Sequence, residues 1–191
     1  MRFQATNLAG AFLIEMQPIA DDRGYFARAF CVAELENHGL NAKIVQSNVA
    51  CSHRRGTLRG LHYQRAPDAE CKLIRCTRGR IYNVIVDLRP ESASHGQWFA
   101  AELTADNHAL VYSPEGFANG YQTLTDDAEI CYSTSRAYAP AAACGVRYND
   151  PALGIRWPLD VSQISPQDQA WPDYDLSPSM RRATSSVGDG P

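Results

Sequence analysis

The sequence lacks the features that mark membrane, exported and nucleic-acid-binding proteins. No run of about eighteen apolar residues occurs, and the N-terminal segment MRFQATNLAGAFLIEM has neither a basic stretch before an apolar core nor a cleavage-site pattern. Basic residues are not in surplus, because 18 Lys and Arg stand against 21 Asp and Glu. We therefore expect a cytoplasmic protein that binds no membrane and no nucleic acid, and that meets any phosphate with a few placed cations.

Cysteine is present, but without the spacing that metal sites and redox motifs require. The six are Cys31, Cys51, Cys71, Cys76, Cys131 and Cys144. Their separations match neither a zinc pair nor a Cys-x-x-Cys motif, so we expect reduced thiols and predict no cysteine chemistry.

The length of 191 residues allows one well-buried core and is too short for two ordinary domains. We expect a single domain over residues 1–174. From about Asp175 the sequence DLSPSMRRATSSVGDGP offers almost nothing to bury, which predicts a disordered tail over 175–191.

Short β-rich segments separated by turn residues recur through the middle of the chain. They are LIRCT, IYNVIVDL, QWFAAELT, LVYS, YQTLT and AEICYST, with Gly, Pro, Asn and Asp clusters between them. The helical signal is thin, since only VAELENHGL, with a stop at Gly39, has helical spacing. This pattern predicts an all-β fold, either an antiparallel sandwich or a jelly roll whose mouth can hold a small ligand.

The stretch QSNVACSHRRGTLRGLHYQ and the residues that follow carry the chemistry. Arg59, His62 and Lys72 fall within fourteen residues, on what should be two neighbouring strands. Histidine can take a proton near neutral pH, arginine matches phosphate oxygens, and lysine can stabilise a developing oxyanion. Residue types alone do not decide the matter, because a histidine in a strand is more often structural than catalytic.

A jelly roll raises the question of a metal, which such barrels often hold through two or three histidines and a carboxylate. The usual positions here read Leu61-His62-Tyr63, with one histidine, and Pro114-Glu115-Gly116-Phe117-Ala118-Asn119, with asparagine last. One imidazole is too few for tight binding of a transition metal, so we predict chemistry on side chains alone.

Taken together, the motifs resemble those of the dTDP-4-dehydrorhamnose 3,5-epimerase family. The matching segments are Asp22-Arg23-Gly24-Tyr25-Phe26, Gln46-Ser47-Asn48, Leu58-Arg59-Gly60-Leu61-His62-Tyr63-Gln64, Lys72-Leu73, Val86-Asp87-Leu88-Arg89, Pro114-Glu115-Gly116-Phe117-Ala118, Tyr132, Tyr148-Asn149-Asp150-Pro151 and Ser165-Pro166-Gln167-Asp168. They run in order over nearly the whole chain. The resemblance implies a cupin-like double-stranded β-helix with a few short helices, acting on a nucleotide-linked 4-keto sugar without a cofactor.

The resemblance also assigns roles to individual residues. His62 would be the base that removes a proton from carbon 3 or 5, Asp168 would orient it, Lys72 would stabilise the enolate, and Tyr132 would return a proton from the opposite face. Among the substrate contacts, Arg23 and Arg59 would meet the diphosphate, Gln46 and Asn48 would be their polar neighbours, and Phe26 and Tyr138 would sandwich the base. The segment from Arg23 to Phe26 would cross to the other subunit of a homodimer with N-terminal segment exchange.

Several positions differ from the pattern of dTDP-using members. They are Arg28 for Glu, Ser47 for Asp, Asn83 for Asp, Asn119 for His, Ala143 for an acidic residue and Gln167 for Lys. We expect Arg28, Ser47, Asn119 and Gln167 to contact the substrate. Kept chemistry with altered recognition predicts a different nucleotide, with CDP, GDP and UDP as alternatives to dTDP, whereas drift at a tolerant rim is the plainer interpretation.

The choice between carbon 3, carbon 5 or both stays open. Three other functions compete with epimerisation: a ketoisomerase on the same fold, a non-catalytic sugar-nucleotide-binding module and a metal-dependent cupin oxygenase.

Overall fold

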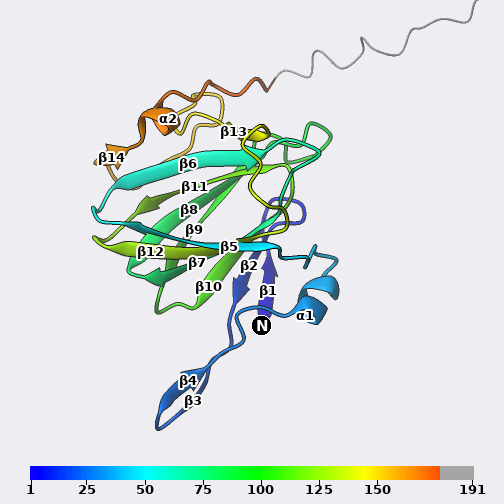
Figure 1. The fold of residues 1–191 in the computed structure, drawn as a ribbon, viewed down its shortest axis with the longest axis vertical. Coiled ribbons are helices and arrows are strands. Elements are labelled where there is room, and N and C mark those ends of the chain that lie inside the picture. Colours follow the sequence, from blue (N-terminus) through cyan, green and yellow to red (C-terminus); the bar gives the residue numbers. More distant parts are fainter. Residues whose placement is uncertain (177–191) are drawn as a thin grey trace, which may run out of the picture.

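The computed structural model describes residues 1–176, in which two antiparallel β-sheets pack face to face (Figure 1). The predicted tail lies outside the described residues except for Asp175 and Leu176. Leu176 packs on the body, where its side chain lies against Gly96.

The first sheet has the strand order β1-β2-β10-β7-β12-β5. Its strands are β1 (Arg2–Ala5), β2 (Phe12–Glu15), β5 (Gln46–Ser52), β7 (Lys72–Arg78), β10 (Ala109–Ser113) and β12 (Ala128–Thr134). Strand β12 pairs with β5 on one side and β7 on the other, with Tyr132 opposite Asn48 and Ile74. Alternate residues of these strands therefore face the second sheet.

The second sheet has the order β13-β6-β11-β8-β9, and β14 pairs with the outer part of β6. Its strands are β6 (Thr57–Gln64), β8 (Arg80–Asp87), β9 (Trp98–Thr104), β11 (Phe117–Thr123), β13 (Ala143–Gly145) and β14 (Gln163–Ile164). In β6, His62 lies between Asn119 of β11 and Gly145 of β13.

Three smaller elements complete the described chain. Strands β3 (Ile19–Asp21) and β4 (Gly24–Phe26) form a hairpin that projects away from the sheets, at the bottom of Figure 1. Helix α1 (Val32–Glu36) packs beside the first sheet, and α2 (Pro166–Gln169) lies beside β6. Neither helix has the length or apolar character needed to cross a membrane.

Three apolar clusters hold these layers together. The central cluster fills the space between the sheets with residues such as Ile74, Ile85 and Leu103. A second cluster packs α1 on the first sheet, and a third covers the outer face of the second sheet with the segment that follows Gly145. Because strands such as β8 are buried on both faces, a one-residue slip would exchange the side chains of the central cluster with those of the third cluster and disrupt the packing of both.

The all-β prediction is confirmed, and the six predicted strand segments fall on β7 to β12, although YQTLT covers only the last three residues of β11. The helix is shorter than its pattern, and Gly39 ends its final turn with a positive φ of 69°. The prediction that Arg59, His62 and Lys72 lie on neighbouring strands was wrong. The chain crosses from one sheet to the other between β6 and β7, so these side chains come from opposite layers.

Candidate active site

A cavity of about 470 Å³ opens between the two sheets, bordered by β5, β7 and β12 on one wall and by β6, β11 and β13 on the other. Its size lies within the range that holds a small organic ligand. Nine of the predicted site residues line it, and Asp168 joins them through its bond to His62. The nine are Gln46, Asn48, Arg59, His62, Lys72, Asn119, Tyr132, Tyr138 and Gln167.

One wall carries an imidazole held by a buried carboxylate. His62 Nε2 lies 2.5 Å from Asp168 Oδ1, and Asp168 Oδ2 accepts from the backbone N–H of Gly60 at 3.2 Å. Asp168 is 4% exposed and sits in the first turn of α2, where its own N–H donates to the side chain of Ser165. The cap and Pro166 start the helix at this point, which brings the carboxylate to β6.

The protonation state of this pair follows from its contacts. Burial alone would raise the pKa of Asp168, but hydrogen bonds from His62, Gly60 and Trp171 outweigh it and lower the pKa below its usual range. An ionised carboxylate only accepts, so Nε2 of His62 carries the hydrogen that it donates. Nδ1 is then the ring nitrogen left to accept a proton from a ligand.

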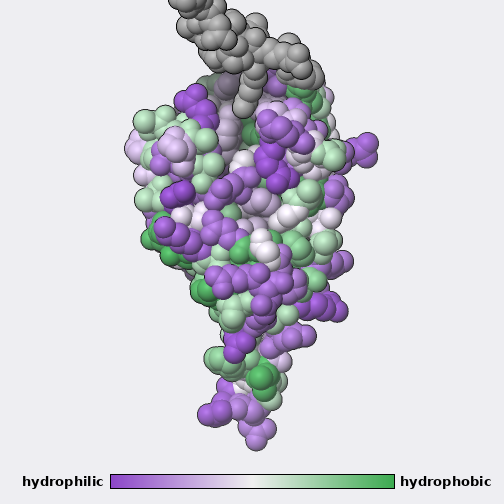
Figure 2. All heavy atoms as spheres, turned by 90° about the vertical axis from the view of Figure 1, so that its right-hand side faces the viewer, coloured by the Kyte–Doolittle hydropathy of each residue, from purple (hydrophilic) through white to green (hydrophobic). Residues whose placement is uncertain are grey.

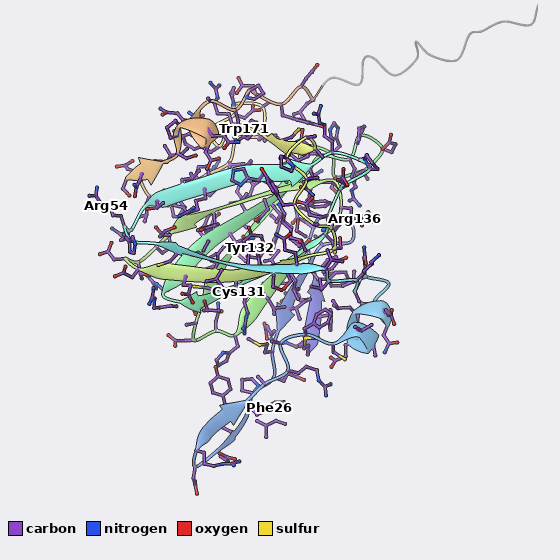
Figure 3. All side chains as sticks on the ribbon, viewed as in Figure 1. Phe26, Arg54, Cys131, Tyr132, Arg136 and Trp171 are labelled. Atoms are coloured by element: carbon purple, nitrogen blue, oxygen red, sulfur yellow. The ribbon has the colours of Figure 1, made fainter. Side chains whose placement is uncertain are left out.

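The opposite wall carries an ammonium and a phenol. Lys72 Nζ lies 3.0 Å from Glu70 Oε1 and donates to the backbone oxygen of His62 at 3.2 Å. Tyr132 lies one diagonal step away on the same inner face, because Lys72 pairs with Thr134 and Tyr132 with Ile74. His62 and Tyr132 therefore face one cavity from two different sheets; Figure 3 labels Tyr132 between the layers.

The phenol of Tyr132 is kept neutral by its surroundings. Burial raises its pKa, the negative charge of Glu70 raises it further, and the guanidinium of Arg59 acts in the opposite direction. The net result is a raised pKa, so this side chain holds its proton well above neutral pH.

Polar groups continue from these walls toward the cavity mouth. Arg59 is fixed by hydrogen bonds to Ser52 Oγ at 3.0 Å and to the backbone oxygen of Cys51 at 3.1 Å. Gln46 links this wall to the rim, because its side chain donates to Asn48 and accepts from the backbone N–H of Tyr138. A guanidinium and an exposed aromatic ring that line one cavity suit an anionic ligand with a flat end.

Asn119 occupies the cross-strand position next to His62. Its Nδ2 donates to Asn83 Oδ1 at 3.0 Å and to the backbone oxygen of Val84 at 3.1 Å. The carbonyl oxygen of Val84 fixes which way the amide points, since it accepts only from a donor. What this side chain has left for a ligand is an acceptor, its Oδ1.

Four predicted contacts do not reach the cavity within one chain. Arg23 pairs with Asp21 at the tip of the β3–β4 hairpin, and Phe26 on the same hairpin is 71% exposed. Figure 2 shows this hairpin as a narrow projection, and Figure 3 labels Phe26 on it, far from Tyr132. Arg28 pairs with Glu34 of α1.

Ser47 is the fourth, and its side chain lies outside the cavity of this chain. Side chains of a strand alternate between faces, so Gln46 and Asn48 enter the cavity and Ser47 points outward. There its hydroxyl bonds to Ser133 at 2.7 Å.

The sequence interpretation missed Trp171. Its indole N–H lies 3.3 Å from Asp168 Oδ1, and its ring lines the cavity beside α2 (Figure 3). Gly145 makes room for it, because a Cβ there would lie 2.3 Å from the ring. No local sequence pattern predicts this contact, because Gly145 and Trp171 are distant in the sequence and meet only in the folded chain.

Potential metal ligands gather at one place among the described residues, and it is outside the cavity. Donor atoms of Cys51, His53 and Asp127 lie within 4.8 Å of one another. The guanidinium of Arg78 donates to Cys51 Sγ at 3.2 Å, so a positive charge already occupies this cluster. It opposes a second cation there.

Comparison with known proteins decides the family. The family model described as dTDP-4-dehydrorhamnose 3,5-epimerase matches residues 5–175. The chain belongs to the dTDP-4-dehydrorhamnose 3,5-epimerase family. The family predicted from the sequence is thus confirmed, and with it the enzyme class, an isomerase, and the cupin-like fold.

Individual members of the epimerase family are similar over most of their length. A dTDP-4-dehydrorhamnose 3,5-epimerase from Methanothermobacter thermautotrophicus is 40% identical over 89% of this chain and 92% of its own. The Bacillus anthracis enzyme, solved with TDP and pyrophosphate bound, has a TM-score of 0.88 and 39% identity, covering 91% of this chain and 99% of its own. ChmJ, a 3'-monoepimerase from Streptomyces bikiniensis, was solved with dTDP-quinovose; it has a TM-score of 0.81 and 35% identity over 88% of this chain and 85% of its own.

Proposed function

We propose that this chain is a cofactor-independent epimerase that inverts carbon 3, carbon 5 or both of a nucleoside-diphosphate 4-keto-6-deoxyhexose. The observation that carries the proposal is the cavity itself. It places a carboxylate-paired imidazole on one wall, and a neutral phenol with an ammonium on the other. Two proton-transfer groups on opposite sides of one ligand suit inversion of a carbon centre.

His62 is the base in this mechanism. A hydrogen on carbon is a very weak acid, but a neighbouring ketone at carbon 4 lets the electron pair of the broken C–H bond move onto oxygen. Nδ1 of His62 takes the proton, and Asp168 stabilises the imidazolium that forms. Lys72 presents its remaining N–H to the enolate oxygen, where a placed cation is worth several kcal/mol.

Tyr132 completes the inversion from the other face. Its O–H bond breaks as a new C–H bond forms on the side of the carbon opposite His62, and the ketone is restored. The phenolate regains a proton from solvent and the imidazolium releases one, so the sugar changes configuration without changing composition. Which carbons undergo this cycle depends on how the ring sits between the two walls; the relatives include both 3,5-epimerases and a 3'-monoepimerase.

The cavity mouth is the proposed nucleotide end. Arg59 meets the diphosphate with Gln46 and Asn48 beside it, and Tyr138 stacks on the base. Asn119 accepts a hydrogen bond from a sugar hydroxyl next to the reacting carbon, and Gln167 lies at the sugar rim.

We propose a homodimer in which the β3–β4 hairpin completes the partner's site. The hairpin exposes Ile19, Tyr25 and Phe26 at 73%, 59% and 71%, far more apolar surface than an isolated arm should leave in water. Burying these residues on a partner would bring Arg23 to the diphosphate and Phe26 to the base. A cytoplasmic location is proposed as well, because all six cysteines lie in the described part of the chain as free thiols.

A complementation experiment tests the exchange of hairpins. We expect H62A and R23A each to be nearly inactive, whereas a mixed dimer of the two contains one site with an intact His62 and an intact arm from the partner. Co-expression should restore about a quarter of wild-type activity if the arm acts on the partner. No recovery in proven mixed dimers shows that the arm acts on its own chain.

The function is tested by incubating the protein with dTDP-, CDP-, GDP- and UDP-linked 4-keto-6-deoxyglucose in deuterated water. We expect deuterium at carbon 3, carbon 5 or both with one of these, and none with H62A. The Bacillus anthracis relative holds TDP, which makes dTDP the first choice, while Arg28 is the position to examine if another base is preferred. Absence of deuterium with every nucleotide would remove the proposal.

The same assay separates the competing functions. A ketoisomerase returns its proton along one face and moves the carbonyl to carbon 3, which product analysis detects. A binding module binds the nucleotide sugar without exchange. The neutral, partly buried Tyr132 opposite His62 favours the epimerase over both, because neither alternative needs an acid on the second wall.

A further inference from the structure

A buried carboxylate, that of Glu70, lies near Lys72 and Tyr132 on the wall formed by the first sheet. Glu70 lies in the segment that crosses from β6 to β7, lines the cavity and is 8% exposed. One of its oxygens, Oε1, lies 3.0 Å from Lys72 Nζ. The other, Oε2, is inaccessible to solvent and has no hydrogen-bond partner among the described residues. A charge this buried is costly to keep, so its position calls for a reason beyond stability.

Its first effect is on the direction of Lys72. An ammonium has three N–H donors, and two of them are taken, by Glu70 Oε1 at 3.0 Å and by the backbone oxygen of His62 at 3.2 Å. Two fixed acceptors leave one direction for the third donor. Since the Lys72 side chain is only 12% exposed and lines the cavity, that donor is held toward a ligand in one orientation.

Its second effect is on the charge around Tyr132. Lys72 and Tyr132 are diagonal neighbours on the inner face of the first sheet, and Arg59 faces the same phenol from β6. The guanidinium of Arg59 favours ionisation of the phenol, and an ionised phenol has no proton to donate. Burial raises the pKa of Tyr132, and the negative charge of Glu70 raises it further and offsets Arg59; Tyr121 of β11 faces the same phenol as a neutral group.

We propose that Glu70 is a positioning residue of this site: it fixes the Lys72 ammonium where the enolate oxygen forms and holds the Tyr132 phenol in its neutral, proton-donating form. The inference rests on the proposed function, because it assigns Glu70 to the enolate and proton-return steps. Glu70 acts through its two neighbours and makes no contact with the sugar.

Three variants test this assignment. E70Q keeps the shape and removes the charge, E70D keeps the charge and shortens the side chain, and E129Q makes the same change as E70Q on the outer face of β12, where Glu129 bonds to Thr77. Each is assayed with the nucleotide sugar that the wild-type chain turns over. The readouts are kcat, KM, the pH profile of kcat/KM, and the dissociation constant of the free nucleoside diphosphate.

We expect E70Q to lower kcat by about 10- to 100-fold with unchanged nucleoside diphosphate binding. The alkaline limb of its kcat/KM profile should move to lower pH, because the Tyr132 phenol loses a neighbouring negative charge and ionises at a lower pH. E70D should lower kcat, since Lys72 is released, but keep the wild-type alkaline limb. E129Q should match the wild type throughout.

Wild-type kcat and an unmoved alkaline limb in E70Q overturn the inference. So does a loss that E70Q and E70D share equally and that comes with weakened nucleotide binding, which marks a structural role. If E70Q does not fold, E70D decides: wild-type kcat overturns the inference, and reduced kcat with an unmoved limb supports it. A wild-type chain that exchanges no deuterium is a failure of the proposed function, whereas an active wild type matched by E70Q is a failure of this inference alone.

Discussion

Replacing Asp168 with asparagine isolates the contribution of one negative charge to the proposed base. Oδ1 of Asp168 accepts from His62 Nε2 and Trp171 Nε1, and Oδ2 accepts from the N–H of Gly60. An asparagine keeps more of these bonds when its oxygen takes the Oδ1 place. The amide N–H₂ then meets the N–H of Gly60, so one hydrogen bond is lost, while the orientation of His62 is retained.

The loss of activity can be worked out from this geometry. In the wild type the imidazolium that forms during proton transfer lies beside a carboxylate, with charge centres about 4 Å apart. At an effective dielectric constant of about 20 their attraction is about 4 kcal/mol, which corresponds to about 10³-fold in rate. Since asparagine carries no charge, we expect D168N to slow deuterium exchange by about that factor, with nucleotide binding unchanged.

The assay is deuterium incorporation followed by NMR under single-turnover conditions, with D173N as the control. Asp173 pairs with Arg147 near the surface and has no contact with the cavity in the described structure. D173N should exchange at the wild-type rate. If D168N stays within about tenfold of the wild type while H62A is inactive, the carboxylate does not stabilise the imidazolium and the reasoning is wrong.

Three further predictions concern stability and the supports of the site. Burial would raise the pKa of Asp87, but hydrogen bonds from Arg89, Ser92 and Ser94 outweigh it and lower the pKa to about 2. Because the pKa of Asp87 is lower in the folded than in the unfolded chain, its ionised carboxylate stabilises the fold at pH values above the unfolded pKa. About 2 kcal/mol of the free energy of unfolding should therefore be lost as the pH falls from about 4 toward about 2. Urea unfolding of D87N should lack this dependence on pH. G145A should displace the Trp171 ring, destabilise the fold by about 1–3 kcal/mol and slow exchange; an unchanged indole fluorescence and rate would contradict the packing. W171F keeps a ring over Gly145 but donates nothing to Asp168, so it should slow exchange with a smaller loss of stability than G145A, as thermal unfolding would measure.

Local sequence patterns predicted the strands that are long enough to show several β-forming residues between turn residues. Segments such as IYNVIVDL and AEICYST became β8 and β12 because one face of each packs on the central cluster. The strands β1 to β4 and β13 to β14 carry too few residues for such a pattern to appear. Strand β1 pairs with β2 and β3 with β4 as neighbours along the chain, whereas β13 and β14 pair with β6, which is distant in the sequence.

For the site, the sequence predicted the residue types but not the architecture. His62, Lys72 and Tyr132 were chosen by motif, yet the two walls exist only because the chain crosses between sheets after β6. Glu70 and Trp171 were missed because they act through the side chains they touch, Lys72 and Asp168, and no spacing in the sequence encodes such contacts. The period of a strand already places Ser47 on the opposite face of β5 from Gln46 and Asn48.

In the proposed mechanism, His62 removes the proton from one face and Tyr132 returns a proton to the other. This mechanism is tested most directly by measuring deuterium exchange and inversion together in Y132F. Without the phenol O–H, His62 can still remove a proton and return a deuteron to the same face. We predict that Y132F incorporates deuterium at a substantial fraction of the wild-type rate while the recovered sugar keeps its configuration. Equal loss of exchange and inversion in Y132F, or full inversion without the hydroxyl, would contradict the assignment of Tyr132 as the opposing acid.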